Sequence, residues 1–227
     1  MGKVGNRIRL AIDRPAHELI ERFRDATTPD LADAMNKSGA MREIYPMYTP
    51  VPRCIGPAIT VKAPIGDSLM IRKAMTIAQP GDIIVIDGSG TISSSLWGGN
   101  RSTLVAARGV AGVIVDGGTR DVDETQAVEL PLFARAVCPM ASASAGTGEL
   151  NFPISCGGLV VNPGDIVVAD SDGIVVIPKD DAEDVYVTWQ KVVEREAEWR
   201  AKSAAGQEFS GDDVDYLLRE LETEILE

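Results

Sequence analysis

The sequence has little of several residue types on which common enzyme sites depend. It contains one histidine, His17, among 227 residues, which excludes multi-histidine zinc sites and argues against Ser-His-Asp or Cys-His catalysis. The three cysteines, Cys54, Cys138 and Cys156, are scattered and lack CxxC spacing, so we expect reduced thiols. No apolar run approaches the roughly 20 residues that a membrane-spanning helix needs. Chemistry must therefore depend on carboxylates, arginine, backbone N–H groups and an oxygen-bound metal.

Positive charge is also scarce. The chain has 22 Lys and Arg against 34 Asp and Glu, for a formal net charge of -12 and a pI of about 4.6. This balance argues against nucleic acid or an anionic membrane surface as the main partner. A small acid remains a suitable ligand, but only at a local positive site. Residues 1–13 carry no apolar signal core, so we expect a cytoplasmic protein.

Residues 81–124 are typical of one βαβ unit. The β-branched run at 83–86 predicts a strand, the apolar spacing over 100–108 predicts a helix, and Gly109 suits the helix C-cap. A second apolar run at 110–115 predicts another strand. Two short, fully apolar runs around a helix indicate parallel strands that are buried on both faces.

Parallel strands would bring the loops 87–99 and 116–124 to the same edge of the sheet, where open α/β sheets bind ligands. The first loop ends in glycines at a helix N-terminus, which favours an anion. The second loop contains Arg120, whose planar fork suits a carboxylate, and Asp121, whose oxygens suit Mg²⁺ or Mn²⁺. We therefore expect the active site here. Asp87 and Asp116 also end the predicted strands, but turn formation explains them as well.

The remaining segments predict further helices and strands. We expect helices over 15–26, 31–36 (with Thr28 as N-cap), 69–78, 180–202 and 212–226, a strand over 58–63, and a hairpin of 166–169 with 174–177. We expect an α/β catalytic core over 1–178. The helical tail, 179–227, is expected to pack on this core or on a neighbouring subunit.

The spacing of the expected site residues resembles a family signature. Gly99 is followed after twenty residues by Arg120-Asp121 and after two more by Glu124, which is similar to the pattern of RraA-like proteins. That family includes class II aldolases for 4-hydroxy-4-methyl-2-oxoglutarate and 4-carboxy-4-hydroxy-2-oxoadipate. The likeness covers residues 25–210, and its further blocks are 33–34, 56–60, 66–67, 79–82, 107–112, 162–165 and 169–173.

The resemblance implies a fold and an assembly. The fold is an α/β/β/α sandwich with a swivelling-domain-like β/β/α core and C-terminal helices. The assembly is a homotrimer or homohexamer with sites between subunits, which Glu196 of the terminal helix would approach from a neighbour.

The resemblance also implies a divalent-metal lyase that acts on pyruvate-yielding oxo acids, with Mg²⁺ or Mn²⁺ as cofactor. Arg120 would bind the pyruvyl carboxylate with the backbone N–H groups of Asn100 and Arg101, next to Gly99. Asp121 would hold the metal, directly or through water, and Glu124 would complete the catalytic set.

The sequence departs from the dedicated aldolases at Gly99, where they carry an aspartate that helps water to move protons. Glycine there is the pattern of members for which oxaloacetate decarboxylation is the implied activity. The family also contains ribonuclease regulators that act by protein contact and lack the complete Arg-Asp site. A regulator without catalysis is therefore the alternative, although the intact Arg120-Asp121 favours an enzyme.

Overall fold

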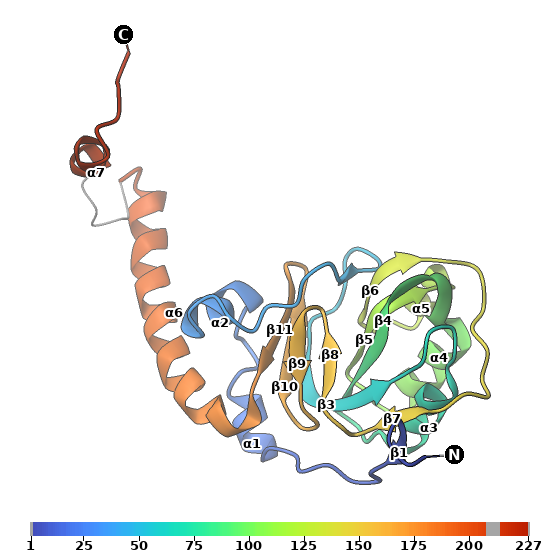
Figure 1. The fold of residues 1–227 in the computed structure, drawn as a ribbon. Helices are drawn as coiled ribbons and strands as arrows, with labels where there is room; N and C mark the ends of the chain where they lie inside the picture. Colours follow the sequence, from blue (N-terminus) through green and yellow to red (C-terminus); the bar gives the residue numbers. More distant parts are fainter. Residues whose placement is uncertain (1, 208–213, 227) are drawn as a thin grey trace.

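The structure, a computed structural model, describes residues 2–207 and 214–226. Its centre is a sheet in which four neighbouring strands run parallel in chain order: β3 (Cys54–Lys62), β4 (Ile83–Trp97), β5 (Gly112–Thr119) and β6 (Leu132–Val137). Three helices connect these strands and cover one face of the sheet: α3 (Leu69–Ile77), α4 (Gly99–Ala107) and α5 (Val122–Ala127) (Figure 1). The predicted βαβ unit with parallel strands is therefore confirmed.

The predicted hairpin forms the second β layer. β10 (Ile166–Asp170) and β11 (Gly173–Ile177) pair in antiparallel register across a two-residue turn. β10 also pairs with the first half of β3, at Cys54 to Pro57, whereas the second half of β3 pairs with β4. β3 therefore joins the two layers, and a small ribbon of β8 (Ile154–Cys156) and β9 (Leu159–Val161) lies beside them.

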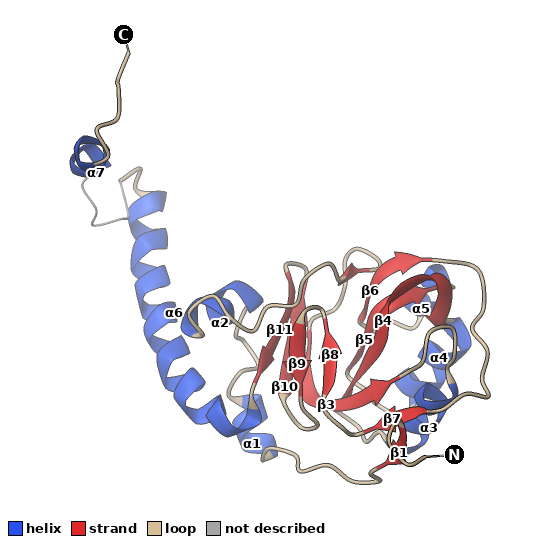
Figure 2. Cartoon of the chain, in the orientation of Figure 1, coloured by secondary structure: helices blue, strands red, loops and turns tan. Residues whose placement is uncertain are grey.

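Helices on the far side of this hairpin complete the fold (Figure 2). They are α1 (His17–Glu21), α2 (Thr28–Ala34), the short 3-10 helix η1 (Lys179–Asp181) and α6 (Ala182–Ala204). The second half of α6 extends beyond the body of the molecule towards α7 (Val214–Glu220) (Figure 1). The remaining strands are β1 (Asn6–Ile8), β2 (Tyr45–Pro46) and β7 (Gly148–Leu150), which lie towards the edges of the main sheet.

Three hydrophobic clusters fill the spaces between these layers. Along β4, Ile84 packs towards α3 and α4, whereas Ile83 packs towards the hairpin layer. On β10, Val167 faces the parallel sheet and Ile166 faces Phe23 and the outer helices. Burial on both faces explains the continuous apolar runs in these strands. The layers follow one another as α/β/β/α, as expected.

The sequence-based boundaries differ from the structure in several places. β3 begins four residues before the expected strand over 58–63, and β5 continues to Thr119, past the expected strand end at 115. We expected a loop over 87–99, but β4 continues to Trp97. Over this part its pairing with β5 shifts in register several times. Its pairing with β5 uses backbone groups, so a run of Gly and Ser can form it without an apolar pattern. α1 covers only His17–Glu21, because N–H groups at 23, 24 and 26 bond three residues back and tighten the chain into turns.

Another correction concerns a cap. The N-cap of α2 is Thr27, whose side chain accepts the N–H of Asp30, whereas Thr28 lies inside the helix. Thr28 instead donates its hydroxyl to Asp170 at 2.6 Å, which ties α2 to the hairpin. The expected helix over 212–226 is described as Val214–Glu220, and residues 212 and 213 lie outside the described part of the chain. Within that part, no helix is both long and apolar enough to cross a membrane.

Candidate active site

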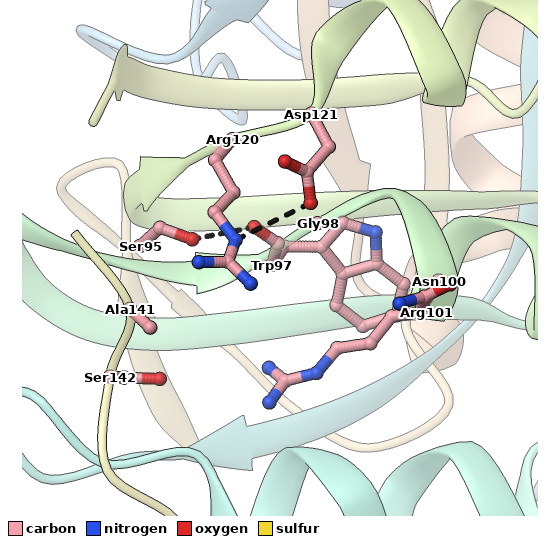
Figure 3. Close-up of a pocket in the computed structure, with 9 residues that line it drawn as sticks. All are labelled: Ser95, Trp97, Gly98, Asn100, Arg101, Arg120, Asp121, Ala141 and Ser142. Carbon is pink, nitrogen blue, oxygen red and sulfur yellow. Dashed lines mark hydrogen bonds and ion pairs between the residues drawn. The ribbon is translucent and has the colours of Figure 1, made fainter. Parts of the chain in front are cut away.

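A cavity of about 240 Å³ lies at the carboxyl ends of β4 and β5, at the start of α4. The end of β4, the first turn of α4, the β5–α5 junction and the segment 141–142 all contribute to its wall (Figure 3). The lining residues are Ser95, Trp97, Gly98, Asn100, Arg101, Arg120, Asp121, Ala141 and Ser142. The structure thus brings Asn100, Arg101, Arg120 and Asp121 around one cavity, at the sheet edge where we expected the site.

Asp121 is held in an unusual backbone conformation. Its φ of 54° and ψ of 47° are left-handed, a conformation that aspartate tolerates better than most residues, and it is the N-cap of α5. Its Oδ2 atom accepts the N–H of Gly99 at 3.1 Å and lies 3.3 Å from Nε of Arg120. The carboxylate therefore bridges the start of α4 and the arginine next to it in sequence.

Buried hydroxyl groups fix the position of Asp121. The indole N–H of Trp97 donates to Ser102 Oγ at 2.9 Å, and Ser102 shares a 2.8 Å hydrogen bond with Thr125 Oγ1. Thr125 in turn donates its hydroxyl to the carbonyl of Asp121 at 3.1 Å. Ser102 and Thr125 are fully buried, and this chain of hydrogen bonds connects the end of β4 through α4 to α5.

The Arg120 backbone is anchored while its side chain stays accessible. Its N–H donates to the carbonyl of Trp97 at 3.1 Å, and its side chain is 41% exposed. The guanidinium points into the cavity, on the side of Ser95 and Ala141 (Figure 3). Because Nε faces Asp121, the terminal nitrogens are the ones presented to a ligand. This is the arrangement that a bidentate carboxylate contact requires.

We expected the backbone N–H groups of Asn100 and Arg101 to bind a ligand, and this was wrong for Arg101. The Arg101 N–H donates to the carbonyl of Gly98 at 3.0 Å, so this amide is engaged in the first turn and does not face a ligand. Its guanidinium lines the cavity instead. The Gly99 N–H donates to Asp121, and among the described residues the Asn100 N–H makes no hydrogen bond. Asn100 is therefore the amide left for an anion.

The two glycines before and within α4 make room for carboxylates. A Cβ atom on Gly98 would lie 2.7 Å from Oδ2 of Asp121. A Cβ atom on Gly99 would lie 2.0 Å from Oε2 of Glu124 and 2.8 Å from its Cβ. The carboxylates of Asp121 and Glu124 thus approach consecutive residues of the same helix start, although Glu124 does not line the cavity itself.

These donors suit one kind of metal site. Among the described residues there is no cluster of three or more His, Cys, Asp or Glu that could enclose an ion. Mg²⁺ usually keeps several waters and binds through one or two carboxylates together with the ligand. Asp121, with Glu124 nearby, fits this open type of site, because Oδ1 of Asp121 makes no hydrogen bond within the described chain. The donor set does not fit a closed zinc centre.

The other candidate aspartates have structural roles. Asp116 Oδ2 accepts the N–H of Gly157 at 2.7 Å and its Oδ1 pairs with Arg135, on the side of the sheet away from α4. Asp87 accepts the N–H of Ser89 at 3.0 Å, and burial raises the pKa of Asp87. Neither residue lines the cavity.

Sequence reasoning missed the wall formed by Ser95, Ala141 and Ser142. Segment 141–146 is held over the cavity by Asp67, whose carboxylate accepts the N–H groups of Ala145 and Gly146 at 2.8 Å each. Asp67 also accepts the N–H of Leu69 at 2.8 Å, although the N-cap of α3 is Ser68. A long-range contact of this kind leaves no local signal in the sequence.

The fold and the cavity together define an α/β protein with a small arginine-lined cavity at the carboxyl edge of parallel strands. Comparison with known proteins gives the family: residues 28–176 match the RraA-like family, described as Aldolase/RraA. The chain belongs to this family, as its signature residues predicted.

Relatives carry two kinds of name. The chain is 36% identical over 188 residues to a Halalkalibacterium halodurans protein named "Putative 4-hydroxy-4-methyl-2-oxoglutarate aldolase", covering 83% of this chain and 88% of that one. It is 32% identical to the 4-hydroxy-4-methyl-2-oxoglutarate aldolase of Thermus thermophilus, covering 68% and 94%. It also resembles the solved structure of the RNA-processing inhibitor RraA from Thermus thermophilus, with a TM-score of 0.62, 32% identity, and coverage of 68% and 93%.

Proposed function

We propose that the protein is a divalent-metal-dependent lyase that cleaves a C–C bond in small oxo acids and releases pyruvate. The observation that carries this proposal is the Arg120–Asp121 pair, which faces one small cavity beside the N-terminus of α4. The names of two relatives support it: one is named a 4-hydroxy-4-methyl-2-oxoglutarate aldolase, and the other carries the same name as "Putative". Oxaloacetate and 4-hydroxy-4-methyl-2-oxoglutarate are the substrates to test.

Each residue of the site has a distinct part in this reaction. Arg120 binds the carboxylate next to the 2-oxo group and fixes its orientation, aided by the free N–H of Asn100 and the dipole of α4. Asp121 and Glu124 hold Mg²⁺ or Mn²⁺, directly or through water. When bound, the metal supplies Lewis-acid stabilisation of the negative charge that develops on the 2-oxo oxygen.

The residue at 99 decides between decarboxylation and aldol cleavage. When oxaloacetate is cleaved, the departing fragment is CO₂, and no hydroxyl proton has to be removed. An aldol substrate needs a base for that proton, and Gly99 has no side chain to provide one. We assign Glu124 to the metal, and its carboxylate blocks any side chain at 99, so residue 99 cannot hold a water for proton transfer either. We therefore propose oxaloacetate decarboxylation as the more efficient activity.

The test is pyruvate release by the purified protein from each of the two substrates, with Mg²⁺ or with EDTA. Metal-dependent release from oxaloacetate is the expected result, together with slower or no release from the aldol substrate. Arg120→Ala should raise KM and lower kcat, because the arginine both binds and orients the carboxylate. Arg24→Ala, at an exposed arginine in the turn that follows α1, serves as the charge-matched control. Unchanged kinetics in Arg120→Ala would remove this residue from the site.

A regulator without catalysis is the second candidate, because one similar solved structure is titled as an RNA-processing inhibitor. This function requires a stable protein partner and no metal-dependent turnover. Pull-down with wild type and with Arg120→Ala separates the two: a regulator would retain its partner when the cavity is altered. For the enzyme we further propose a homotrimer or homohexamer, which light scattering in solution would test.

A further inference from the structure

The cavity contains more positive charge than one carboxylate requires. Its lining includes two arginines, Arg101 and Arg120, but a single acidic residue, Asp121. The two guanidinium groups enter from different sides, Arg120 beside Asp121 and Arg101 from the first turn of α4 (Figure 3). In a chain with a formal net charge of -12, this local excess of positive charge stands out.

Arg101 is held in place by neutral groups. Nη1 donates to the carbonyl of Leu96, and Nη2 donates to Ser68 Oγ at 2.8 Å. Among the described residues, none of the ion pairs includes Arg101. An arginine has more N–H donors than the two in use here, so donors remain for a ligand. Both of these partners are neutral, so connecting α3, α4 and β4 does not require a positively charged side chain.

The surroundings of Arg101 are unfavourable to that charge. Partial burial lowers the pKa of Arg101, and the nearby positive charges of Arg72 and Arg120 lower it further. Arg72 is itself engaged with the neutral hydroxyl of Ser144 at 3.3 Å. A half-buried charge without a counter-ion is costly, and an anionic ligand in the cavity would remove the cost. Such unfavourable charge is typical of binding sites.

The geometry points to a specificity role: we propose that the Arg101 side chain binds a second carboxylate of the substrate, while Arg120 binds the first. This proposal rests on the proposed function for the Arg120 end. It makes Arg101 the residue that distinguishes dicarboxylates from monocarboxylates of the same length. With 4-hydroxy-4-methyl-2-oxoglutarate, the C–C bond that breaks would then lie between the two arginines, beside segment 141–142. With oxaloacetate, the carboxylate at Arg101 is the group that leaves as CO₂, so Arg101 would serve there to recognise the substrate before the bond breaks. The cavity of about 240 Å³ suits an acid of a few carbon atoms.

Binding of two unreactive oxo acids in the presence of Mg²⁺ tests this assignment without requiring turnover. The pair is 2-oxoglutarate and 2-oxopentanoate, which have the same carbon chain and differ in the distal carboxylate. Calorimetric titration of wild type should show about ten-fold or more tighter binding of 2-oxoglutarate, because a charge-assisted hydrogen bond is lost with 2-oxopentanoate. Arg101→Gln should reduce this ratio to about one and leave 2-oxopentanoate binding unchanged.

Three further variants separate the alternatives. Lys73→Gln removes one positive charge from α3 next to Arg72 and should keep the affinity ratio of 2-oxoglutarate to 2-oxopentanoate. If Lys73→Gln lowers this ratio as much as Arg101→Gln does, the preference comes from the overall positive charge around the cavity, and the proposal is overturned. Arg120→Gln should weaken both ligands equally. Arg101→Lys, which keeps the charge and guards against loss of folding in Arg101→Gln, should retain part of the preference.

The outcomes distinguish this proposal from the proposed function. Equal binding of both acids to wild type, or an unchanged ratio in Arg101→Gln, would overturn the role of Arg101 while leaving the Arg120 site intact. Failure of both acids to bind wild type would overturn both proposals. Preferential binding of 2-oxoglutarate that depends on Arg101 and is accompanied by no lyase activity would support the carboxylate assignment and contradict only the reaction.

Discussion

Gly99 and Glu124 are sterically coupled: a Cβ atom on residue 99 would lie 2.0 Å from Oε2 of Glu124, 2.8 Å from its Cβ and 2.9 Å from its Cδ. The carboxylate of Glu124 thus occupies the space that a side chain at 99 would need. The two positions are alternatives for one volume beside the start of α4. In this protein Glu124, on α5, occupies that volume.

The first prediction follows from this contact. Gly99→Ala should destabilise the protein by about 1–3 kcal/mol, because Glu124 and the first turn of α5 must shift to admit a methyl group. In the background Glu124→Gly, which removes all three contacting atoms, the same change should cost much less. A double-mutant cycle on urea unfolding measures the difference as a coupling energy.

The steric contact between residues 99 and 124 also predicts an effect on aldol cleavage. Gly99→Asp alone should fail to produce aldol cleavage of 4-hydroxy-4-methyl-2-oxoglutarate, whereas Gly99→Asp in the Glu124→Gly background has room for the new carboxylate. Strictly additive unfolding energies, within about 0.3 kcal/mol, would show that the two positions are independent and that this steric argument is wrong.

The second prediction concerns the buried hydroxyl chain. Ser102→Ala should destabilise the protein by about 1–3 kcal/mol, because the indole N–H of Trp97 and the hydroxyl of Thr125 lose a buried partner. Thr103→Ala, next in sequence but exposed on α4, is the matched control and should cost less. Thermal unfolding of the two variants makes the comparison, and equal losses would contradict the importance of the buried chain.

Much of the fold was predictable because strands that are buried on both faces have continuous apolar sequences. The runs that became β4, β5, β10 and β11 are apolar and β-branched, and Gly109 closes α4 with the left-handed φ of 75° that its place predicted. The second half of β4 was not predictable, since its Gly and Ser residues pair through backbone groups. The end of α1 was likewise set by turns and packing.

The site was predictable to the extent that it follows the chain. Arg120 and Asp121 succeed a buried parallel strand, so topology alone brings them to the helix start at Gly99. The contribution of Ser142 was not predictable, because it depends on a distant carboxylate, Asp67, that holds the segment in place. The side-chain position of Arg101 depends equally on Ser68, far away in sequence.

The third prediction uses the titration of Asp67. Burial alone would raise the pKa of Asp67, but backbone N–H groups of Leu69, Ala145 and Gly146 outweigh it, and the pKa is lowered from 3.8. A carboxyl with a lowered folded pKa contributes stability that is fully present above its unfolded pKa. This stability is lost as the pH falls through the folded value.

Asp67→Asn should therefore reduce stability near neutral pH and flatten the loss of stability below about pH 4. Urea midpoints measured from about pH 2.5 to pH 6 would show both effects, with Asp25→Asn on the exposed surface as control. Because Asp67 holds segment 141–146, the variant should also exchange the amide hydrogens of this segment faster. A pH profile parallel to that of wild type would contradict the role of this carboxylate.

The fourth prediction addresses the metal. Asp121→Asn keeps the shape of the side chain and its hydrogen bond from Gly99, but loses the charge that an oxygen-bound cation requires. Wild type should gain thermal stability on addition of Mg²⁺ or Mn²⁺ in proportion to the logarithm of the metal concentration above Kd, and EDTA should remove the gain.

Asp121→Asn should lose this response without unfolding, whereas Asp123→Asn, on the exposed side of α5, should keep it. Glu124→Gln should weaken the response less than Asp121→Asn does, since its carboxylate lies beside Gly99 and outside the lining of the cavity. An unaltered metal response in Asp121→Asn would place the cation elsewhere and would separate metal binding from the Arg120–Asp121 pair.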